Sequence, residues 1–168
     1  ISERYIRGAK PSQRLEVVHG SVLDTITKLD DSTVDLVVTS PPYCNRYDYT
    51  RTYALELAFL GVNETEIRQL RQSLLTCTVE HKSRDLGSYS DLPLQKALKA
   101  HSENSALDVI VRFLKSEAAH GVLNNRGIVS MVNGYFLDLA LHLAQIFSKM
   151  KAGSSYFMVN DNVQYNGI

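Results

Sequence analysis

The sequence predicts an α/β fold, because stretches with the hydrophobic period of a strand and stretches with that of a helix follow one another along the chain. Val34–Thr39 is an almost wholly apolar run of strand length, typical of a strand buried on both faces of a parallel sheet. Ser105–Ala119 has the amphipathic pattern of a helix, with one stripe made of Leu107, Ile110, Val111 and Leu114. The 168 residues suffice for one domain with its own core.

The first fifty residues predict a strand, a helix and a second strand. Leu15–His19 is rich in β-formers and stops at Gly20, so we expect a short strand there. Ser21 is the expected N-cap of a short helix. A turn at 30–32 leads into the strand Val34–Thr39, which gives a βαβ unit with a right-handed crossover. Val22, Ile26 and Leu29 would share one face of this helix.

The middle of the chain, from Arg51 to about Leu123, is predicted to be mostly helical. We expect one helix over 53–60, ended by Gly61, another over 64–75, and the amphipathic helix over 105–119. The polar stretch 81–93 contains a glycine and a proline, so it predicts an exposed loop.

The last part of the chain predicts a return to the sheet. Residues 128–132 are apolar but short, and fit either a strand or the start of a helix. A helix is expected over 135–150, ended by Gly153, and 155–159 should form a third buried strand. The helix has apolar residues at helical spacing, namely Leu139, Leu143, Ile146, Phe147 and Met150.

Composition narrows the class of protein. The 18 basic residues balance 18 acidic ones, so contacts to nucleic-acid phosphates would need local clusters of charge. No apolar run approaches the roughly 20 residues of a membrane span. The two cysteines and the five scattered histidines predict neither a disulfide framework nor a metal site. We therefore expect a protein of the reducing cytoplasm, with no metal and no membrane among its partners.

The tetrapeptide Ser40-Pro41-Pro42-Tyr43 directly follows the strand Val34–Thr39. Ligands of open α/β sheets bind beyond the carboxyl ends of the strands, which is where this segment should lie. The two prolines fix φ and remove two backbone donors, and Pro41 keeps Ser40 extended. The sequence therefore predicts a stiff loop whose carbonyl groups can face a ligand.

Such a loop suits methylation of an exocyclic amine on a nucleobase, a poor nucleophile whose lone pair is delocalised into the ring. The Ser40 oxygen and the Pro41 carbonyl could accept hydrogen bonds from the two N–H groups of the amine. They would then stabilise the charge that develops as the amine attacks the sulfonium methyl of AdoMet. The base must first leave the duplex, and stacking on Tyr43 would contribute about 1–3 kcal/mol.

Three segments carry a family resemblance. Val34–Tyr43 resembles motif IV of the amino-methyltransferases that modify N4 of cytosine or N6 of adenine in DNA, and Val18–Leu23 resembles the strand and turn before it in the circularly permuted (β-class) members. Met150–Gly153 followed by Tyr156–Val159 resembles a later segment of the same enzymes. Together these cover about half of the chain, and the helical middle is unmatched. Serine at the first motif position is more typical of cytosine-N4 enzymes.

The resemblance implies an incomplete Rossmann-like methyltransferase sheet of three or more mostly parallel strands with a helical insertion. Residues 1–50 would form the first part of the core, 51–125 the insertion, and 126–168 the return to the core. The implied activity is transfer of a methyl group from S-adenosyl-L-methionine (AdoMet) to N4 of cytosine, or to N6 of adenine, in a flipped-out base of double-stranded DNA. A restriction-modification context follows from the family alone.

The resemblance also implies the site residues. The catalytic segment would be Ser40, Pro41, Pro42 and Tyr43, and base or DNA contacts would come from Tyr43, Asn45, Arg46 and Tyr47. The residues expected to bind the cofactor are Gly20, Ser21, Thr39, Asn160 and Asp161. Cys44 is expected to be an ordinary small side chain and not a nucleophile. The basic residues in the middle of the chain are expected to lie on a solvated helix face because acidic residues alternate with them: Arg68, Arg71, Lys82 and Arg84.

Two departures from the family pattern bear on the cofactor. Gly20 is followed by Ser21 where an acidic residue is usual, and no Gly-x-Gly occurs anywhere in the chain. The glycine-rich AdoMet loop of β-class enzymes lies beyond the segment where this chain stops. We therefore interpret the chain as a piece whose partner is a missing C-terminal half, and expect this piece alone to bind AdoMet weakly or not at all and to be inactive.

Two other classes of function remain open. The same chemistry could act on guanine N2 in RNA or on a glutamine amide in a protein, although those relatives more often have Asn or Asp at the position of Ser40. Alternatively, the chain could be a non-catalytic DNA-binding subunit that lacks the cofactor loop.

Overall fold

The computed structural model describes residues 15–164. The predicted α/β class is confirmed: one strand and several short helices precede a group of long helices, and a second strand follows it. In chain order the elements are α1 Val22–Thr25, β1 Val34–Thr39, α2 Tyr49–Thr52, α3 Ala54–Phe59, α4 Glu64–Ser73, α5 Asp91–Ser102, α6 Ser105–Ala119, α7 Gly127–Lys149 and β2 Met150–Met158. Single 3-10 turns lie at Ile26–Lys28 and Leu86–Ser88.

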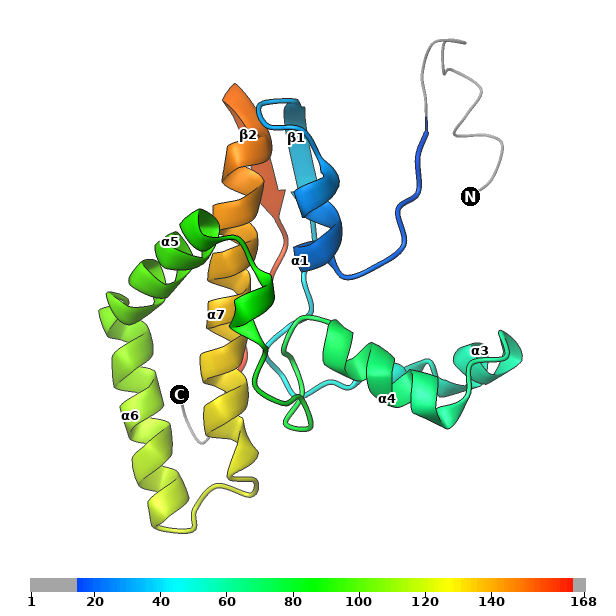
Figure 1. The fold of residues 1–168 in the computed structure, drawn as a ribbon. Helices are drawn as coiled ribbons and strands as arrows, with labels where there is room; N and C mark the ends of the chain where they lie inside the picture. The colour runs from blue at the N-terminus through cyan, green and yellow to red at the C-terminus, as the bar shows by residue number, and fades with distance from the viewer. Residues whose placement is uncertain (1–14, 165–168) are drawn as a thin grey trace.

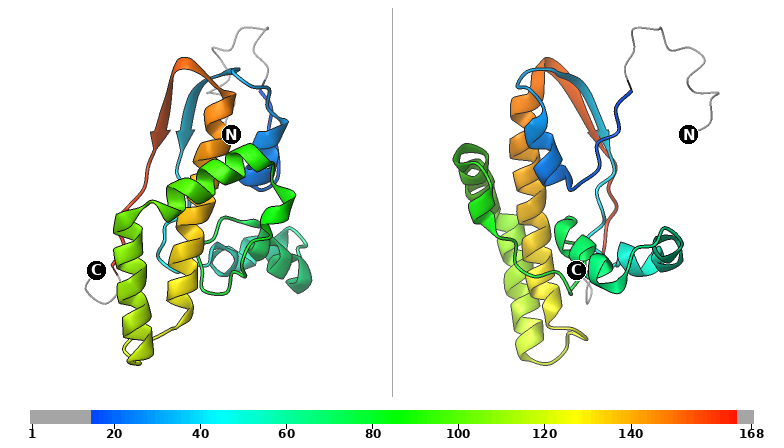
Figure 2. Two further views of the ribbon diagram at one scale, coloured as in Figure 1. Left: turned by 60° about the vertical axis from the view of Figure 1, so that its left-hand side comes forward. Right: turned by 45° about the vertical axis from the view of Figure 1, so that its right-hand side comes forward.

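Helix α7 is the middle layer of the fold. The strand pair β1 and β2 lies along one side of it, and α5 and α6 lie on the other side (Figures 1 and 2). The helices α3 and α4 extend away from this body, near the level at which both strands end (Figure 1). The carboxyl ends of the two strands therefore meet α4 and the loops around it.

The two strands are parallel, as predicted for Val34–Thr39 and the strand that follows the long helix. Val37 pairs with Tyr156 and Val38 with Phe157, and the register is irregular between Val34 and Leu36. The helix predicted over 135–150 spans Gly127–Lys149 instead, so residues 128–132 belong to its start, and Gly153 does not end it because β2 already begins at Met150. Gly153 lies inside β2 with φ of 80°, a conformation that glycine adopts without strain, opposite the irregular part of β1.

The predicted strand Leu15–His19 is wrong. These residues form no regular structure and all five are exposed. A strand must pair its backbone groups with a neighbour, and within residues 15–164 the sheet contains only β1 and β2. The βαβ unit expected in the first fifty residues is therefore not formed, and the structure shows two of the three or more strands predicted.

The expectation that β1 is buried on both faces is also wrong for this chain. Leu36 is 56% exposed and Val38 71% exposed. Side chains alternate across a strand, so both lie on one face, and Val38 shares that face with its partner Phe157, which is 58% exposed. The described residues thus leave uncovered the face of the sheet that carries Leu36, Val38 and Phe157.

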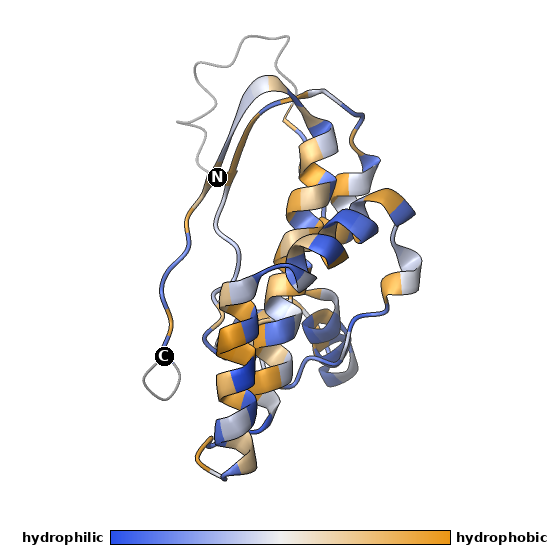
Figure 3. Ribbon diagram, turned by 90° about the vertical axis from the view of Figure 1, so that its left-hand side faces the viewer, coloured by the Kyte–Doolittle hydropathy of each residue, from blue (hydrophilic) through white to orange (hydrophobic). Residues whose placement is uncertain are grey.

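The core is built around α7. One cluster of buried residues joins α6 to the first half of α7, and a second joins α1 and α5 to Leu141. Hydrophobic residues run along both α6 and α7 in Figure 3. The face predicted for the second half of α7 is partly wrong: Leu143 is 40% and Phe147 73% exposed, whereas polar His142 and Gln145 are buried. A helix flanked on two sides buries more than a single stripe, so its spacing alone did not identify the inward positions.

By length and composition α7 is apolar enough to cross a membrane, contrary to the expectation from the sequence. It is the central helix of this fold, and it carries a buried carboxylate, Asp138, that is held by an arginine. A helix at the core of a protein often has this length and composition, so α7 is weak evidence for a membrane span.

The helical middle follows the prediction closely, with one exception. Helix α6 has the expected bounds, and α4 begins with a reciprocal capping box between Asn63 and Glu66. The loop predicted over 81–93 is wrong at its end, because α5 already begins at Asp91. Pro93 lies in the first turn of α5, where a missing N–H costs no helical hydrogen bond.

The basic residues of this region are not one solvated face. Arg68 is exposed and pairs with Glu64, as expected. Arg71 is only 15% exposed and pairs with Asp48 at 2.9 Å, and Arg84 is 11% exposed and pairs with Asp138 at 2.8 Å. The alternation of basic and acidic residues along the sequence could not show that Arg71 and Arg84 are largely buried and pair with carboxylates distant in sequence.

Candidate functional site

The segment Ser40–Tyr43 leaves the carboxyl end of β1, where the sequence placed it. The Val159 N–H donates to the Thr39 carbonyl at 2.9 Å, which continues the pairing one residue past β2. This bond holds the chain after β2 beside the motif. Ser40 is exposed, Pro41 is buried and Tyr43 is half-buried. The residues of the motif thus differ in burial, and they line two cavities: Ser40 to Pro42 line one and Tyr43 the other.

The first cavity, here called the Pro41 cavity, has a volume of about 390 Å³. It lies between the start of α1, the end of β1, the segment after α4 and one side chain of α7. Its walls are mostly apolar. The lining residues are Gly20, Ser21, Val22, Thr39, Ser40, Pro41, Pro42, Tyr49, Leu74, Leu75, Cys77 and His142.

Two buried polar atoms at the Pro41 cavity have no hydrogen-bond partner among the described residues. They are Oγ of Ser21, a residue only 9% exposed, and Nδ1 of His142, a residue only 6% exposed. Ser21 precedes α1 as predicted, but its side chain makes no capping bond. The other ring nitrogen of His142, Nε2, lies 2.9 Å from the Tyr156 hydroxyl, and burial lowers the pKa of this histidine. An unpaired buried polar group is costly, so both atoms are available to a ligand.

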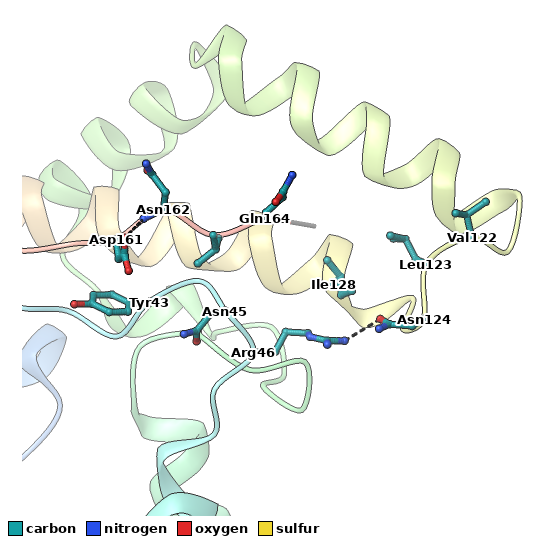
Figure 4. A pocket seen from close by; sticks show the side chains of 11 residues that line it. Tyr43, Asn45, Arg46, Val122, Leu123, Asn124, Ile128, Asp161, Asn162 and Gln164 are labelled. Atoms are coloured by element: carbon teal, nitrogen blue, oxygen red, sulfur yellow. Dashed lines mark hydrogen bonds between the residues drawn. The ribbon is translucent and has the colours of Figure 1, made fainter. Parts of the chain in front are cut away.

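The second cavity, the Tyr43 cavity, has a volume of about 500 Å³ and shares no lining residue with the Pro41 cavity. Figure 4 shows Tyr43 and Asn45 beside the segment that follows β2, and Arg46 extended toward Asn124. The α6–α7 loop closes the far end. The lining residues are Tyr43, Asn45, Arg46, Val122, Leu123, Asn124, Ile128, Asp161, Asn162, Val163 and Gln164.

Arg46 has a left-handed backbone, with φ of 64°, which is uncommon for a residue with a side chain. Its Nη1 donates to Oδ1 of Asn124 at 2.9 Å, and this bond links the motif segment to the α6–α7 loop (Figure 4). A backbone outlier held by a specific contact is a frequent feature of binding sites.

The structure separates the residues that the sequence grouped as cofactor contacts. Gly20, Ser21 and Thr39 line the Pro41 cavity together with Ser40, Pro41 and Pro42. Asp161 instead lines the Tyr43 cavity. Asn160 donates to the Tyr135 hydroxyl at 3.1 Å and lines a third cavity of about 370 Å³, which Asp161 also lines.

The residues expected to contact the base or DNA are only partly together. Tyr43, Asn45 and Arg46 share one cavity, whereas Tyr47 lines neither of the two cavities beside the motif. Tyr47 packs edge-on against Tyr49, with ring centroids 5.2 Å apart, and is 47% exposed.

Several lining residues had no pattern in the sequence that pointed to them. Leu74 and Leu75 follow α4, Asn124 lies in the α6–α7 loop, and His142 is one turn beyond the middle of α7. Each reaches a cavity through the packing of helices that are distant in sequence. A polar residue inside an apolar helix, as His142 is, was the one hint available.

Cys44 directly follows the motif but is suited to packing and not to attack. It is 6% exposed, and burial, with a smaller contribution from Cys77, raises the pKa of its thiol to about 12. Burial likewise raises the pKa of Cys77 to about 11. A nucleophilic cysteine needs a lowered pKa and an electropositive setting, so these values support the expected packing role. No group of side chains in residues 15–164 has the make-up of a metal site.

Comparison with known proteins finds similarity to type II methyltransferases. The chain is 47% identical over 154 residues to the type II methyltransferase M.AvaI of Nostoc sp. (strain PCC 7120 / SAG 25.82 / UTEX 2576), and equally to M.AvaI of Anabaena variabilis. It is 46% identical over 159 residues to the type II methyltransferase M.BsoBI of Geobacillus stearothermophilus. No protein-family model and no solved structure matches the chain.

These alignments cover most of this chain but a minor part of each relative. They include 92% of the chain for M.AvaI and 90% for M.BsoBI, and in each case 31% of the relative. Both cavities and the Ser40–Tyr43 segment lie in the part of the chain described here. The chain is thus similar, over about nine tenths of its length, to roughly a third of each of these type II methyltransferases.

Proposed function

We propose that this chain supplies the part of an AdoMet-dependent DNA amino-methyltransferase that presents the target base to the methyl donor. The observation that carries the proposal is the placement of Ser40–Tyr43 between two cavities in a chain 46–47% identical to type II methyltransferases. The proposed product is N4-methylcytosine in double-stranded DNA, with N6-methyladenine as the second candidate. Restriction-modification is the proposed context, and residues 1–50, 51–125 and 126–168 are the proposed parts.

The Pro41 cavity is the proposed place of part of AdoMet. Its apolar walls suit a flat heterocycle, and the unpaired Ser21 Oγ and His142 Nδ1 suit the polar groups at the rim of such a ring. The fit is partial, because the chain has no glycine-rich loop for the rest of the molecule. When bound here, AdoMet would supply an electrophilic methyl group for transfer to the amine nitrogen.

The Tyr43 cavity is the proposed place of the flipped base. Tyr43 offers its ring face, and Asn45, Asp161 and Asn162 offer amide and carboxylate groups for the base edge. A base held here would lie next to the motif segment through Tyr43. The Ser40 side-chain oxygen and the Pro41 carbonyl are the proposed acceptors of hydrogen bonds from the two amine N–H groups.

The residues of this chain would act by position and hydrogen bonding. Two acceptors on the amine favour a pyramidal nitrogen and stabilise the positive charge that develops on it. The stiffness of Pro41-Pro42 keeps these acceptors in place, so little reorganisation is needed at the moment of transfer.

The test is a methylation assay on the intact protein, with labelled AdoMet, a mixed-sequence DNA duplex and mass spectrometry of the digested nucleosides. N4-methylcytosine supports the proposal in full, and N6-methyladenine supports the chemistry with the other base. Ser40→Ala should reduce kcat by about 100-fold or more, the usual effect of removing one polarised contact to developing charge. Thr52→Ser, a small change on an exposed helix outside both cavities, should leave kcat unaltered.

The rival functions give different products. Label in RNA or in protein, with none in DNA, would move the acceptor to guanine N2 or to a glutamine amide. DNA binding with no label in any acceptor would leave the non-catalytic subunit as the function of the chain.

A further inference from the structure

The wall of the Pro41 cavity formed by Leu74, Leu75 and Cys77 is not part of any helix or strand. It belongs to the segment between α4 and the 3-10 turn at Leu86–Ser88. Leu74 still donates its N–H to the Leu70 carbonyl at 3.1 Å, but Thr76 and Cys77 are held through side chains.

A buried carboxylate on α7 provides that attachment. Asp138 is 2% exposed and accepts from the Thr76 N–H at 2.9 Å and from the Thr76 hydroxyl at 2.8 Å. Its two oxygens also accept from Nε and Nη2 of Arg84, both at 2.8 Å. All four of these hydrogen bonds to the buried Asp138 carboxylate therefore come from the segment that carries the wall.

Arg84 completes the attachment from the other side. Its Nη2 donates to the carbonyl of Leu74, the first residue of the wall, at 2.6 Å, while its Nη1 lies 3.4 Å from the Tyr89 hydroxyl. Thr76 also packs closely on α7, since a Cβ at Gly134 would lie 3.1 Å from its methyl group. The ion pair thus holds the wall at Leu74 and at Thr76, where ring nitrogens of His81 also lie 3.2 Å from the Leu74 carbonyl and from the Thr76 hydroxyl.

Stability alone explains such a pair poorly. Burying an arginine and a carboxylate costs desolvation that their attraction barely offsets, and well-packed apolar side chains often do as well or better. What apolar side chains cannot supply is four directed hydrogen bonds to a loop. His142, one turn further along α7, lines the cavity that this loop encloses.

We propose that Arg84 and Asp138 are a positioning pair for the methyl-donor cavity, which they shape by holding the Leu74–Cys77 wall against α7. Neither residue lines the cavity. The proposal rests on the proposed function in one respect, namely that the ligand of this cavity is AdoMet. Loss of the pair should loosen the wall, raise KM for AdoMet and leave kcat nearly unchanged, because the reacting groups at Ser40 are on another segment.

The experiment uses the intact protein with three sets of changes. Asp138→Asn removes the charge but keeps the shape, and Asp138→Leu with Arg84→Met replaces the pair by apolar side chains of similar size. Asp108→Asn is the matched control, since Asp108 and Arg112 form an Asp–Arg pair at 2.8 Å that is exposed on α6. The readouts are the urea midpoint, amide hydrogen exchange of residues 75–78, and KM and kcat for AdoMet.

For Asp138→Asn we expect faster exchange at 75–78 and a KM raised about tenfold, the scale of a small misplacement of binding groups. The apolar double variant should recover the urea midpoint yet keep fast exchange and a raised KM. Recovery of all three readouts in the double variant would overturn the proposal and leave a merely structural role. So would an Asp138→Asn variant that behaves like Asp108→Asn.

Two further outcomes are separable. If Asp138→Asn does not fold, the double variant decides the question alone, because it leaves no unpaired charge. If the wild-type protein neither binds AdoMet nor methylates any acceptor, the proposed function fails. The exchange comparison still decides whether the pair holds the wall.

Discussion

The layer of α5, α6 and α7 and the pair β1 and β2 differ in how far each buries its apolar residues. In the helical layer, Leu114 and Leu141 are 1% and 0% exposed. In the sheet, Val38 is 71% and Phe157 58% exposed, although a parallel sheet is ordinarily covered on both faces. The helices α5, α6 and α7 are therefore the better buried part of the molecule, completed by Leu23 of α1 and by Cys44. The sheet contributes mainly the ends of its strands, from which the motif and the chain lining both cavities emerge.

The largest effect should come from the helical layer. Leu141→Ala deletes a side chain that α1 and α5 enclose, and should lower the free energy of unfolding by about 2–5 kcal/mol. Urea unfolding of the intact protein, followed by circular dichroism, measures it. A loss below about 1 kcal/mol would mean that the helical layer is not the closely packed part of the molecule.

The start of α6 should give the next largest effect. The Asn104 side chain accepts from the Leu107 N–H at 3.0 Å, so Asn104→Ala should cost about 1 kcal/mol. Ser90, the N-cap of α5, makes no such bond, and Ser90→Ala is the control with little expected change. Equal effects of the two substitutions on the urea midpoint would contradict the difference between the two caps.

His142, which links α7 to β2 through Tyr156, should make stability depend on pH. Burial lowers the pKa of His142, so the unfolded chain binds its proton more readily than the folded one. This contribution to stability is complete above the ordinary histidine pKa of about 6.5 and is lost as pH falls through the lower folded value. His142→Gln should flatten the decline of the urea midpoint as pH falls below about 6.5. An unchanged decline would place the titrating group elsewhere.

The smallest effect should come from the exposed face of the sheet. Val38→Thr keeps the branched shape that suits a strand, and should change the free energy of unfolding by no more than about 0.5 kcal/mol. The same urea measurement applies. A loss as large as that of Leu141→Ala would show that this face is covered in the intact protein, for instance by a partner.

How much the sequence could predict differs between the same two regions. Local periodicity and caps predicted α6 to the residue, but α7 begins at Gly127 and not at residue 135, and the start of α5 was assigned to a loop. The position of the motif followed from strand order. The failures share a cause: the supposed strand 15–19, the two-sided burial of β1 and the inward face of α7 each depend on what lies beside the element. The sequence of an element alone does not show which element will pack beside it.

The candidate site was predictable to the same extent. Ser40, Pro41 and Pro42 came together with Gly20, Ser21 and Thr39 around one cavity, because all of them lie at ends of elements near β1. Tyr43 and Asp161 instead line the Tyr43 cavity, to which the chain after β2 contributes. His142 and Asp138 could not be assigned from sequence, since α7 meets the site only through tertiary packing.

The central claim is that the motif divides a donor cavity from a base cavity, and paired titrations of the intact protein test it most directly. Ser21→Ala removes an unpaired hydroxyl from the Pro41 cavity, and Asn45→Ala removes an amide from the Tyr43 cavity. We predict that Ser21→Ala weakens AdoMet binding by about fivefold, the value of one hydrogen bond, and leaves the Kd for duplex DNA unchanged. Asn45→Ala should do the reverse. If each substitution weakened both ligands equally, or if Asn45→Ala alone weakened AdoMet, the two-cavity account would be contradicted.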